Sequence, residues 1–494
     1  MSFVPLNRIV RLNDQSLNPD GDFVLYWMVA FRRTRWNFSL QRAVELAKQQ
    51  KKPLVILEAL RCDYRWASDR FHQFVIDGMI DNEKALAKKC VLYYPYLEPQ
   101  PGAGRGLLSS LAKLATAIVT DDFPCFFLPR MIEAVARRSP VQMEAIDSNG
   151  IYPMRDTDRV FSRAHFFRRH LQKTVLPFLD EFPAVDPLKR AKLTEIKTLP
   201  KAITKRWPKS DLSKWNDGKL LAKLPVDHQV AISEVLPGGP KAAEKRLSGF
   251  LASKLSDYGD RNQPERDVAT GLSPYLHFGH ISSHEIFQAV VEHEEWSADQ
   301  VRPKPNGSAQ GWWNMSEPAE GFIDELVTWR EVGFNMCCLT DNYDQFESLP
   351  DWAQLTLREH ESDQREYLYS LEEFEHAKTH DTLWNAAQCQ LVTEGRMHNY
   401  LRMLWGKKIL EWTPNAREAL DIMIELNNKY ALDGRNPNSY SGIFWVLGRY
   451  DRAWGPERPV FGKIRFMSSD NTARKVRVKK YIEQYAPSKA KRLF

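Results

Sequence analysis

The chain has 494 residues, of which 43% are hydrophobic and 27% are charged, and its net charge is +6. This length exceeds one ordinary compact core and predicts two or three domains, while the composition excludes a largely disordered chain. The mildly basic balance permits a nucleic-acid partner without requiring one. Apolar runs such as residues 55–60 are far shorter than the roughly 20 residues that cross a bilayer. We therefore expect no membrane partner and a cytoplasmic location.

Apolar strand patterns alternate with amphipathic helical patterns from residue 22 to about residue 149. This alternation predicts a doubly wound, Rossmann-like α/β domain over residues 1–175, with a parallel sheet that helices cover on both faces. The predicted strands are residues 22–28, 53–60, 91–97, 117–122 and 141–147, and the predicted helices are residues 39–50, 69–89 and 107–115.

The GAGRG segment at residues 102–106 is similar to a dinucleotide-binding loop only in part. Leu107 stands where the third glycine of that motif is required. We therefore interpret this segment as an ordinary loop.

The cysteines indicate neither a disulfide framework nor a metal centre. No two of them have the CxxC spacing of zinc ligands, so we expect reduced thiols and no bound metal. The six cysteines are Cys62, Cys90, Cys125, Cys337, Cys338 and Cys389.

Residues 176–239 are rich in lysine and proline, which predicts an interdomain linker on the surface. Helical periodicity dominates from residue 240 onward, so residues 240–494 are predicted to form an all-α domain. The chain ends in a very basic segment, residues 473–494. This segment is equally consistent with a solvated helix and with contacts to phosphate groups.

Tryptophans are concentrated in a basic stretch at residues 382–412. Trp405 and Trp412 are seven residues apart in a proline-free run of helix formers. Two helical turns would place both indoles on one face, roughly 10 Å apart along the axis. This spacing suits electron hopping between aromatic rings, and it also suits ordinary core packing.

A possible anion site lies at residues 270–274. Thr270, Gly271 and Ser273 precede a helical pattern in which Pro274 occupies the first turn. Free backbone N–H groups at a helix start favour a phosphate, although an ordinary helix cap has the same pattern.

Five ordered motifs resemble the flavin domain of the photolyase/cryptochrome family, and in particular class II cyclobutane pyrimidine dimer photolyases. Residues 26–28 and 148–171 are similar to the α/β domain of the same class, so the resemblance covers almost the whole chain. The five motifs are residues 273–282, 324–331, 369–388, 395–412 and 426–467.

The resemblance implies a bound FAD that is active in its reduced form, FADH⁻. Residues 270–273 match the loop that holds the FAD phosphates, and Asn427 matches the asparagine that faces flavin N5. Arg402 and Asp433 match a salt bridge beside the isoalloxazine. The resemblance does not decide whether the α/β domain holds a deazaflavin antenna chromophore, a folate antenna chromophore or an empty antenna site. The residues that match cofactor contacts are Tyr258, Thr270, Gly271, Leu272, Ser273, Asn399, Arg402, Asn427 and Asp433.

The resemblance also implies a carbon–carbon lyase that acts on UV-damaged DNA, splitting pyrimidine dimers by electron transfer from photoexcited FADH⁻. Glu325 matches the glutamate that hydrogen-bonds the damaged bases, and a desolvated carboxyl group is more easily kept neutral. Trp329 and Trp445 match two aromatic walls for a flipped dimer, and we expect Arg452 to contact the substrate with them. Extruding a dimer costs a few kcal/mol, and stacking at roughly 1–3 kcal/mol per base offsets that cost.

Trp405, Trp384 and Trp412 match, in that order outward from FAD, an electron-transfer chain peculiar to class II. Asn399 stands where class II members commonly have glycine, and Leu404 replaces a tyrosine next to the inner tryptophan. These departures indicate a divergent subgroup.

Two alternatives to repair follow from the same residues. A cryptochrome-like photoreceptor would keep FAD and the tryptophans and would signal through a protein partner. A light-independent nucleic-acid-binding protein would have lost the flavin. Retention of Glu325, Trp329 and Trp445 favours repair. We also expect a monomer that is nucleoid-associated when bound to DNA.

Overall fold

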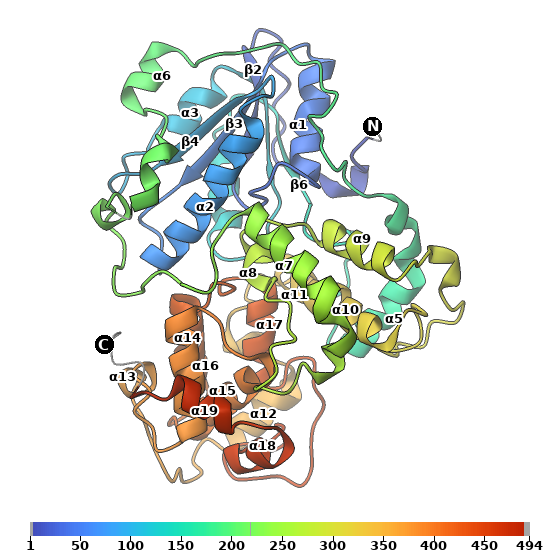
Figure 1. The fold of residues 1–494 in the computed structure, drawn as a ribbon, viewed down its shortest axis with the longest axis vertical. Helices are drawn as coiled ribbons and strands as arrows, with labels where there is room; N and C mark the ends of the chain where they lie inside the picture. Colours follow the sequence, from blue (N-terminus) through green and yellow to red (C-terminus); the bar gives the residue numbers. More distant parts are fainter. Residues whose placement is uncertain (1–2, 218, 489–494) are drawn as a thin grey trace.

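The computed structural model describes residues 3–217 and 219–488, without the side chains of residues 216 and 217. An α/β domain forms one end of the molecule and a helical domain forms the other (Figure 1). The last six residues of the basic segment 473–494 lie outside the described residues.

A six-stranded sheet forms the centre of the α/β domain, with the strand order β1-β6-β5-β2-β3-β4. The pairs from β6 to β4 are parallel, and β2 is buried along its whole length because helices cover both faces of the sheet. This is the doubly wound arrangement that the alternating pattern predicts. The strands are β1 (Ile9–Arg11), β2 (Phe23–Met28), β3 (Leu54–Leu60), β4 (Leu92–Leu97), β5 (Ala115–Asp121) and β6 (Met143–Ile146).

Two elements of this domain were missed by the sequence pattern. The edge strand β1 pairs antiparallel with β6, so the sheet is not wholly parallel. It has only three residues and is partly exposed, which is too short for a periodic signal. Helix α4 is the second missed element, and it has a proline in its first turn. The helices of the sheet region are α1 (Phe38–Gln49), α2 (Asp69–Leu86), α3 (Leu107–Ala112) and α4 (Leu128–Ala136).

Residues 102–106 form a turn before α3, so the prediction of an ordinary loop is confirmed. The strand order reverses between β2 and β5, and this crevice is where doubly wound sheets bind ligands. In this protein the carboxylate of Asp121 fills it. Its oxygens accept the backbone N–H groups of Val29, Ala30 and Phe31 at 2.8 to 2.9 Å and the Tyr26 hydroxyl at 2.8 Å.

The loop after β2 also docks the helical domain. Gly279 has a φ of +71°, and a Cβ atom there would lie 2.0 Å from the carbonyl oxygen of Ala30. Arg33 donates to the Gly279 carbonyl and to the Ser148 hydroxyl. The end of the sheet is therefore an interdomain contact, because backbone from both domains meets there without room for a side chain.

Arg70 of α2 makes a second contact between the domains. Its buried guanidinium donates to the carbonyls of Leu391, Val392 and Tyr430. These carbonyls belong to the C-terminal turns of α14 and α16, where a cation satisfies unpaired acceptors and the helix dipole. The α/β domain thereby helps to hold two helices of the helical domain.

The helical domain begins with α7 at Pro240, where helical periodicity predicts it. The segment before it contains short helical turns and the six-residue helix α6 (Lys201–Arg206). Helix α5 (Ala164–Thr174) precedes that segment and packs on the helical domain through the ion pair of Arg168 with Asp324.

Helices α7 to α11 form the first part of the helical domain. They are α7 (Pro240–Ser253), α8 (Ser273–His277), α9 (Ser283–His293), α10 (Glu317–Ile323) and α11 (Arg330–Leu339). Helices α12 to α19 lie mostly at the end away from the sheet (Figure 1). They are α12 (Asp351–Glu359), α13 (Leu371–Glu375), α14 (Thr382–Glu394), α15 (Asn399–Glu411), α16 (Ala416–Tyr430), α17 (Pro437–Val446), α18 (Ser469–Lys475) and α19 (Lys479–Tyr485).

Candidate functional site

A pocket of about 710 Å³ opens in the helical domain between α15, α17, α18 and the loop that follows α17. This volume is in the range of cofactor and ligand sites. Five of the residues singled out from the sequence line it, namely Glu325, Trp329, Asn399, Arg402 and Trp445.

Glu325 and Trp329 reach the pocket from a π-helix, Asp324–Trp329, between α10 and α11. The helical periodicity from residue 240 onward predicts ordinary helix here, because periodicity cannot show such a local change in hydrogen bonding. π-Helices are rare and frequently lie at functional sites. Glu325 and Trp329 both line the same pocket from this single element.

Burial raises the pKa of Glu325 to about 7, and the neighbouring Asp324 adds to the rise. The guanidinium of Arg261, with a nitrogen 3.7 Å from the carboxylate, opposes it. A substantial share of Glu325 is therefore protonated near neutral pH. In that form its carboxyl group can donate a hydrogen bond to a substrate that gains negative charge.

The indoles of Trp329 and Trp445 stack on each other, with ring centroids 5.0 Å apart and 29° between their planes. The resemblance implies that both rings are walls against which a flipped dimer packs, and the structure shows how the two rings lie relative to each other. Aromatic rings at this separation are in direct contact, so no base fits between them. The two residues form one continuous aromatic surface in the pocket.

Arg452 lies at the rim of the pocket and does not line it. Its guanidinium covers the ring of Trp454 at 4.5 Å, and Arg465 covers the same ring at 4.4 Å. Trp454 and Arg465 do line the pocket. Sequence reasoning missed both residues, because cation–π contacts across a loop leave no periodic signal.

Arg402 and Asp433 meet in an ion pair, with a nitrogen–oxygen distance of 3.2 Å. Asp433 also accepts a hydrogen bond of 2.8 Å from the Ser273 hydroxyl. This carboxylate therefore joins α15 to the loop at residues 270–273. The structure thus brings together residues that lie 31 and 160 positions apart in the chain.

The 270–273 loop ends at α8, which has only five residues. Pro274 lies in its first turn, as predicted, and the Thr270 hydroxyl accepts the Leu272 N–H. Gly271 has a φ of +64°, and a Cβ atom there would lie 2.8 Å from Nη1 of Arg246. This close approach needs glycine and brings a guanidinium against the loop.

Arg246 is a residue that sequence reasoning missed. It belongs to α7, and its Nη2 donates to the Val235 carbonyl while Nε donates to the Tyr275 hydroxyl. Those bonds aim the remaining nitrogen at the loop. Nothing in the local pattern links Arg246 to Gly271, since the contact depends on how α7 packs against α8.

Tyr258 and Asn427 lie behind the pocket wall. Tyr258 is buried, with Arg261 over its ring at 5.0 Å. Asn427 is buried in α16, and its amide donates to the hydroxyl of Ser439 at 2.7 Å. Asn438, next to that serine, lines the pocket. Both predicted cofactor contacts are thus adjacent to the pocket and do not form its surface.

The three tryptophans of the 382–412 stretch form a continuous chain of contacts. Trp405 and Trp384 are nearly parallel, with centroids 6.5 Å apart, and Trp384 and Trp412 are 6.1 Å apart. The indole of Trp384 donates to the Trp405 carbonyl, which fixes its orientation. Trp405 is buried and does not itself line the pocket, but it lies one helical turn after Arg402, which does. Residues three apart on a helix are neighbours, so the chain of rings begins directly behind the pocket wall.

The outer tryptophan, Trp412, is only 2% exposed and does not itself reach solvent. Tyr369 and the exposed His380 pack on it, with centroids at 5.6 and 5.0 Å. The Tyr369 hydroxyl and Nδ1 of His380 are hydrogen-bonded at 2.7 Å. Aromatic groups thus continue from Trp405 to the surface, and the last pair is a phenol hydrogen-bonded to an imidazole.

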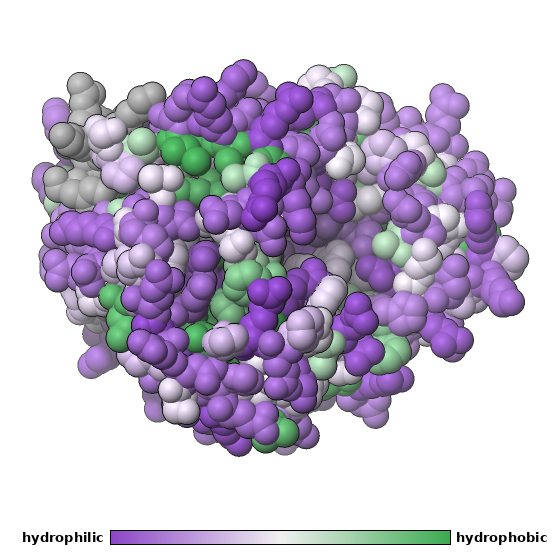
Figure 2. All heavy atoms as spheres, turned by 90° about the horizontal axis from the view of Figure 1, so that it is seen from below, coloured by the Kyte–Doolittle hydropathy of each residue, from purple (hydrophilic) through white to green (hydrophobic). Residues whose placement is uncertain are grey.

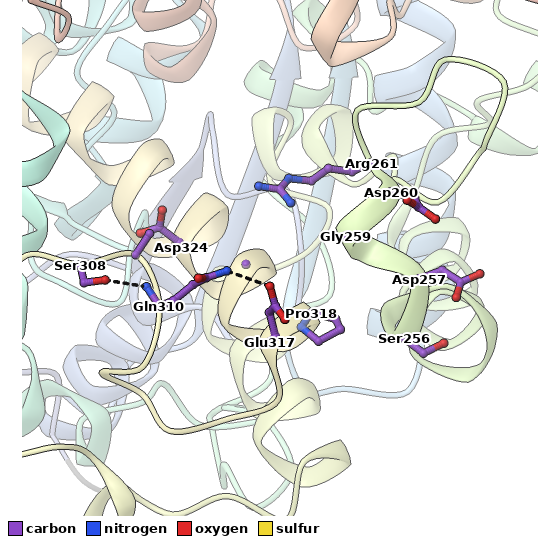
Figure 3. Close-up of a pocket in the computed structure, with 12 residues that line it drawn as sticks. Ser256, Asp257, Gly259, Asp260, Arg261, Ser308, Gln310, Glu317, Pro318 and Asp324 are labelled. Atoms are coloured by element: carbon purple, nitrogen blue, oxygen red, sulfur yellow. Dashed lines mark hydrogen bonds between the residues drawn. The ribbon is translucent and has the colours of Figure 1, made fainter. Parts of the chain in front are cut away.

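A second pocket, of about 410 Å³, adjoins the first at Arg261 (Figure 3). Its carboxylates are already paired. Arg168 binds Asp324, and Gln310 donates to Glu317. The remaining two acidic groups, Asp257 and Asp260, are both bound by Arg266. Since each acid has a partner, this pocket does not offer an open anionic site.

No described helix is long and apolar enough to span a bilayer. Within residues 3–217 and 219–488, no three histidine, cysteine or acidic side chains are grouped so that they could hold a metal ion. All six cysteines are free thiols.

Three relatives match nearly the full length of the chain, and each is named deoxyribodipyrimidine photo-lyase. The protein of Methanothermobacter thermautotrophicus is 32% identical over 97% of both chains. That of Potorous tridactylus is 33% identical over 97% of this chain and 84% of its own. That of Arabidopsis thaliana is 33% identical over 95% of this chain and 89% of its own. No protein-family model matches the chain.

One solved structure has a similar fold. The crystal structure of a bacterial class III photolyase from Agrobacterium tumefaciens aligns with a TM-score of 0.68 at 18% sequence identity. The match covers 96% of this chain and 87% of the other. It confirms the predicted combination of an α/β domain with a helical domain.

Proposed function

The chain belongs to the deoxyribodipyrimidine photolyase family, and from this premise we propose that it repairs cyclobutane pyrimidine dimers in UV-damaged DNA with light. One observation carries the proposal. Glu325 and the stacked indoles of Trp329 and Trp445 line one pocket, and a chain of tryptophans begins one helical turn behind its wall. The assignment to class II stays a prediction of the motifs.

The residues around the pocket suit FAD, the cofactor of this family. The Gly271 turn and the Arg246 guanidinium offer backbone N–H groups and a cation to a diphosphate. The ion pair of Arg402 and Asp433 lies where the pocket wall meets that loop and is suited to tune a flavin ring. When bound and illuminated, reduced FAD supplies the electron that opens the cyclobutane ring. The electron then returns to the flavin.

We assign the remaining FAD contacts to residues behind and beside these groups. Asn427 would face the flavin ring from α16, with Ser439 holding its amide. Asn399 would contact the cofactor from the pocket wall. Tyr258, Thr270, Leu272 and Ser273 complete the set around the phosphate loop.

Three side chains recognise the damaged bases in this proposal. The joined indole surface of Trp329 and Trp445 stacks one face of the flipped dimer, at roughly 1–3 kcal/mol per base. Glu325 in its neutral form donates a hydrogen bond to a base carbonyl as negative charge develops there. Arg452 at the rim holds the DNA next to the dimer.

Trp405, Trp384 and Trp412 pass electrons from the surface to the pocket and so restore the reduced cofactor in light. Ring centroids of 6.5 and 6.1 Å leave the rings in contact, and burial keeps water away from them. Repair by a protein that is already reduced does not need these residues.

The test is illumination of thymine-dimer DNA with blue light in the presence of a reductant. We expect intact thymines in light and none in darkness. Equal repair in both conditions, or no repair with fully reduced flavin, contradicts the proposal.

The absorption spectrum of the same preparation decides whether a deazaflavin or folate antenna accompanies FAD. We further propose that the protein acts as a cytoplasmic, nucleoid-associated monomer.

A further inference from the structure

A short basic segment crosses from α18 to α19 beside the pocket. Five basic residues and no acidic residue lie between positions 474 and 480, and all five are exposed. None of them makes an ion pair with a carboxylate in the described part of the chain. They are Arg474, Lys475, Arg477, Lys479 and Lys480.

The backbone of this segment is held in place. Val476 and Val478 are buried, so apolar side chains alternate with the basic ones. The Arg477 N–H donates to Gln263 and the Lys480 N–H donates to the carboxylate of Glu265. A free terminal helix would need none of these contacts. The basic groups are therefore displayed in a fixed order at the end of α18, in the three-residue connection and at the start of α19.

Helix α19 anchors the far end of the segment. The buried Tyr481 donates to the side chain of Gln390 on α14, and Tyr485 donates to Glu394 on the same helix. These two hydrogen bonds pin α19 to the helix that carries Trp384. The segment is thus fixed at both ends against the helical domain.

The segment also continues the edge of the pocket. Lys475, at the end of α18, lines the pocket together with Asn471 of the same helix. Helices α18 and α19 lie at the end of the molecule away from the sheet (Figure 1). The view onto that end shows a mostly hydrophilic face that is hollowed near its centre (Figure 2).

We propose that residues 474–480 bind the phosphodiester backbone of the damaged strand beside the flipped dimer. This inference rests on the proposed function and names the part of the protein that holds the flanking nucleotides. Unpaired cations on a fixed backbone suit a row of phosphates, since neutralising phosphates releases counterions. Such contacts set position and carry no sequence information. The segment then holds damaged and undamaged DNA alike, while the pocket selects the dimer.

The experiment compares two variants that lose the same number of charges. The first combines Arg477→Gln, Lys479→Gln and Lys480→Gln, none of which lines the pocket. The control combines Lys189→Gln, Lys192→Gln and Lys197→Gln, which are exposed in the linker. Bound flavin absorbance and circular dichroism confirm that both are folded. Each is tested on a short duplex with one thymine dimer, on the same undamaged duplex, and on an isolated thymine-dimer dinucleotide.

We expect the first variant to bind both duplexes more weakly by the same factor. The slope of log affinity against log salt should fall by about 0.9 for each phosphate that is no longer neutralised, and so by about 2.7 for three phosphates. Repair of the dinucleotide in light should stay as in the unchanged protein, because that substrate lacks flanking phosphates. The control variant should keep the original salt slope.

An unchanged salt slope in the first variant overturns the proposal, as does an equal loss in the control. Weaker binding of damaged duplex alone also overturns it, because it would place these residues in dimer recognition. Failure of the proposed function gives a different result. In that case the unchanged protein repairs neither the duplex nor the dinucleotide in light, whatever its affinity for DNA.

Discussion

Polar groups converge both at the end of the sheet and in the helical domain, and the first of these crevices is filled while the second is open. At the end of the sheet, three backbone N–H groups and a tyrosine hydroxyl point at one place, and Asp121 fills it. In the helical domain, Glu325 faces a pocket of about 710 Å³. The fold places a crevice where ligands often bind, but the side chains that point into the crevice determine whether it is free for a ligand.

The two carboxylates show the difference most directly. The Asp121 carboxylate accepts a hydrogen bond from each of the four donors around it. These bonds stabilise the fold and the docking of the helical domain. Glu325 has one cation at 3.7 Å and a pKa that is still raised, which leaves a proton available for chemistry. Perturbed acids that line a pocket are typical of active sites.

The largest effect is expected from Asp121→Ala, compared with Glu325→Ala. The first change leaves three buried N–H groups and the Tyr26 hydroxyl without an acceptor. At roughly 1–3 kcal/mol for each of these four unsatisfied groups, the free energy of unfolding should fall by about 4 kcal/mol or more. The second change should alter stability by only about 0.5 kcal/mol. Urea unfolding of both variants is the measurement, and equal losses would remove the contrast between the crevices.

Trp445→Ala tests the aromatic surface of the open pocket. Losing this half of the stacked pair should weaken binding of dimer-containing DNA by roughly 1–3 kcal/mol, because stacking on the flipped dimer is lost. Fluorescence titration against damaged and undamaged duplexes measures the effect. Affinity for undamaged DNA serves as the control and should not change. Equal weakening of both would assign Trp445 to general DNA binding.

The pH dependence of repair tests the proton on Glu325. Since its pKa is about 7 in the substrate-free protein, the protonated fraction decreases roughly tenfold between about pH 6 and about pH 8. Single-flash repair by prereduced protein should decrease with it. Glu325→Gln keeps a hydrogen-bond donor that does not titrate, so its repair should be independent of pH. A matching decrease in that variant would exclude Glu325 as the titrating group.

The smallest effect is expected from Tyr369→Phe, at the outer end of the tryptophan chain. Tyr369 can pass its proton to His380 when it supplies an electron to Trp412, because the two groups are hydrogen-bonded at 2.7 Å. The variant should accumulate photoreduced flavin more slowly, since charge returns before it reaches the surface. Transient absorption follows this step. Repair by prereduced protein should be unaffected, and a repair defect would assign Tyr369 another role.

Local patterns predicted much of the fold. Alternating strands and helices over residues 22–149 indicated the doubly wound sheet, and the long periodic helices began close to their predicted positions. The three-residue strand β1 was missed because its pairing with β6 is a long-range contact. The π-helix at Asp324–Trp329 was missed because helical periodicity is almost the same on both sides of the change.

For this protein, the sequence by itself determined the residue types of the site and those neighbours that lie within a few turns, such as Glu325 and Trp329. The contacts of Trp384 with both Trp405 and Trp412 follow the order that the resemblance implies. The fold alone brings Arg246 to the Gly271 loop and closes the sheet crevice. Those contacts join distant elements, so packing between helices and domains sets them. Local propensity extends over a few residues and carries no information about which distant surfaces meet.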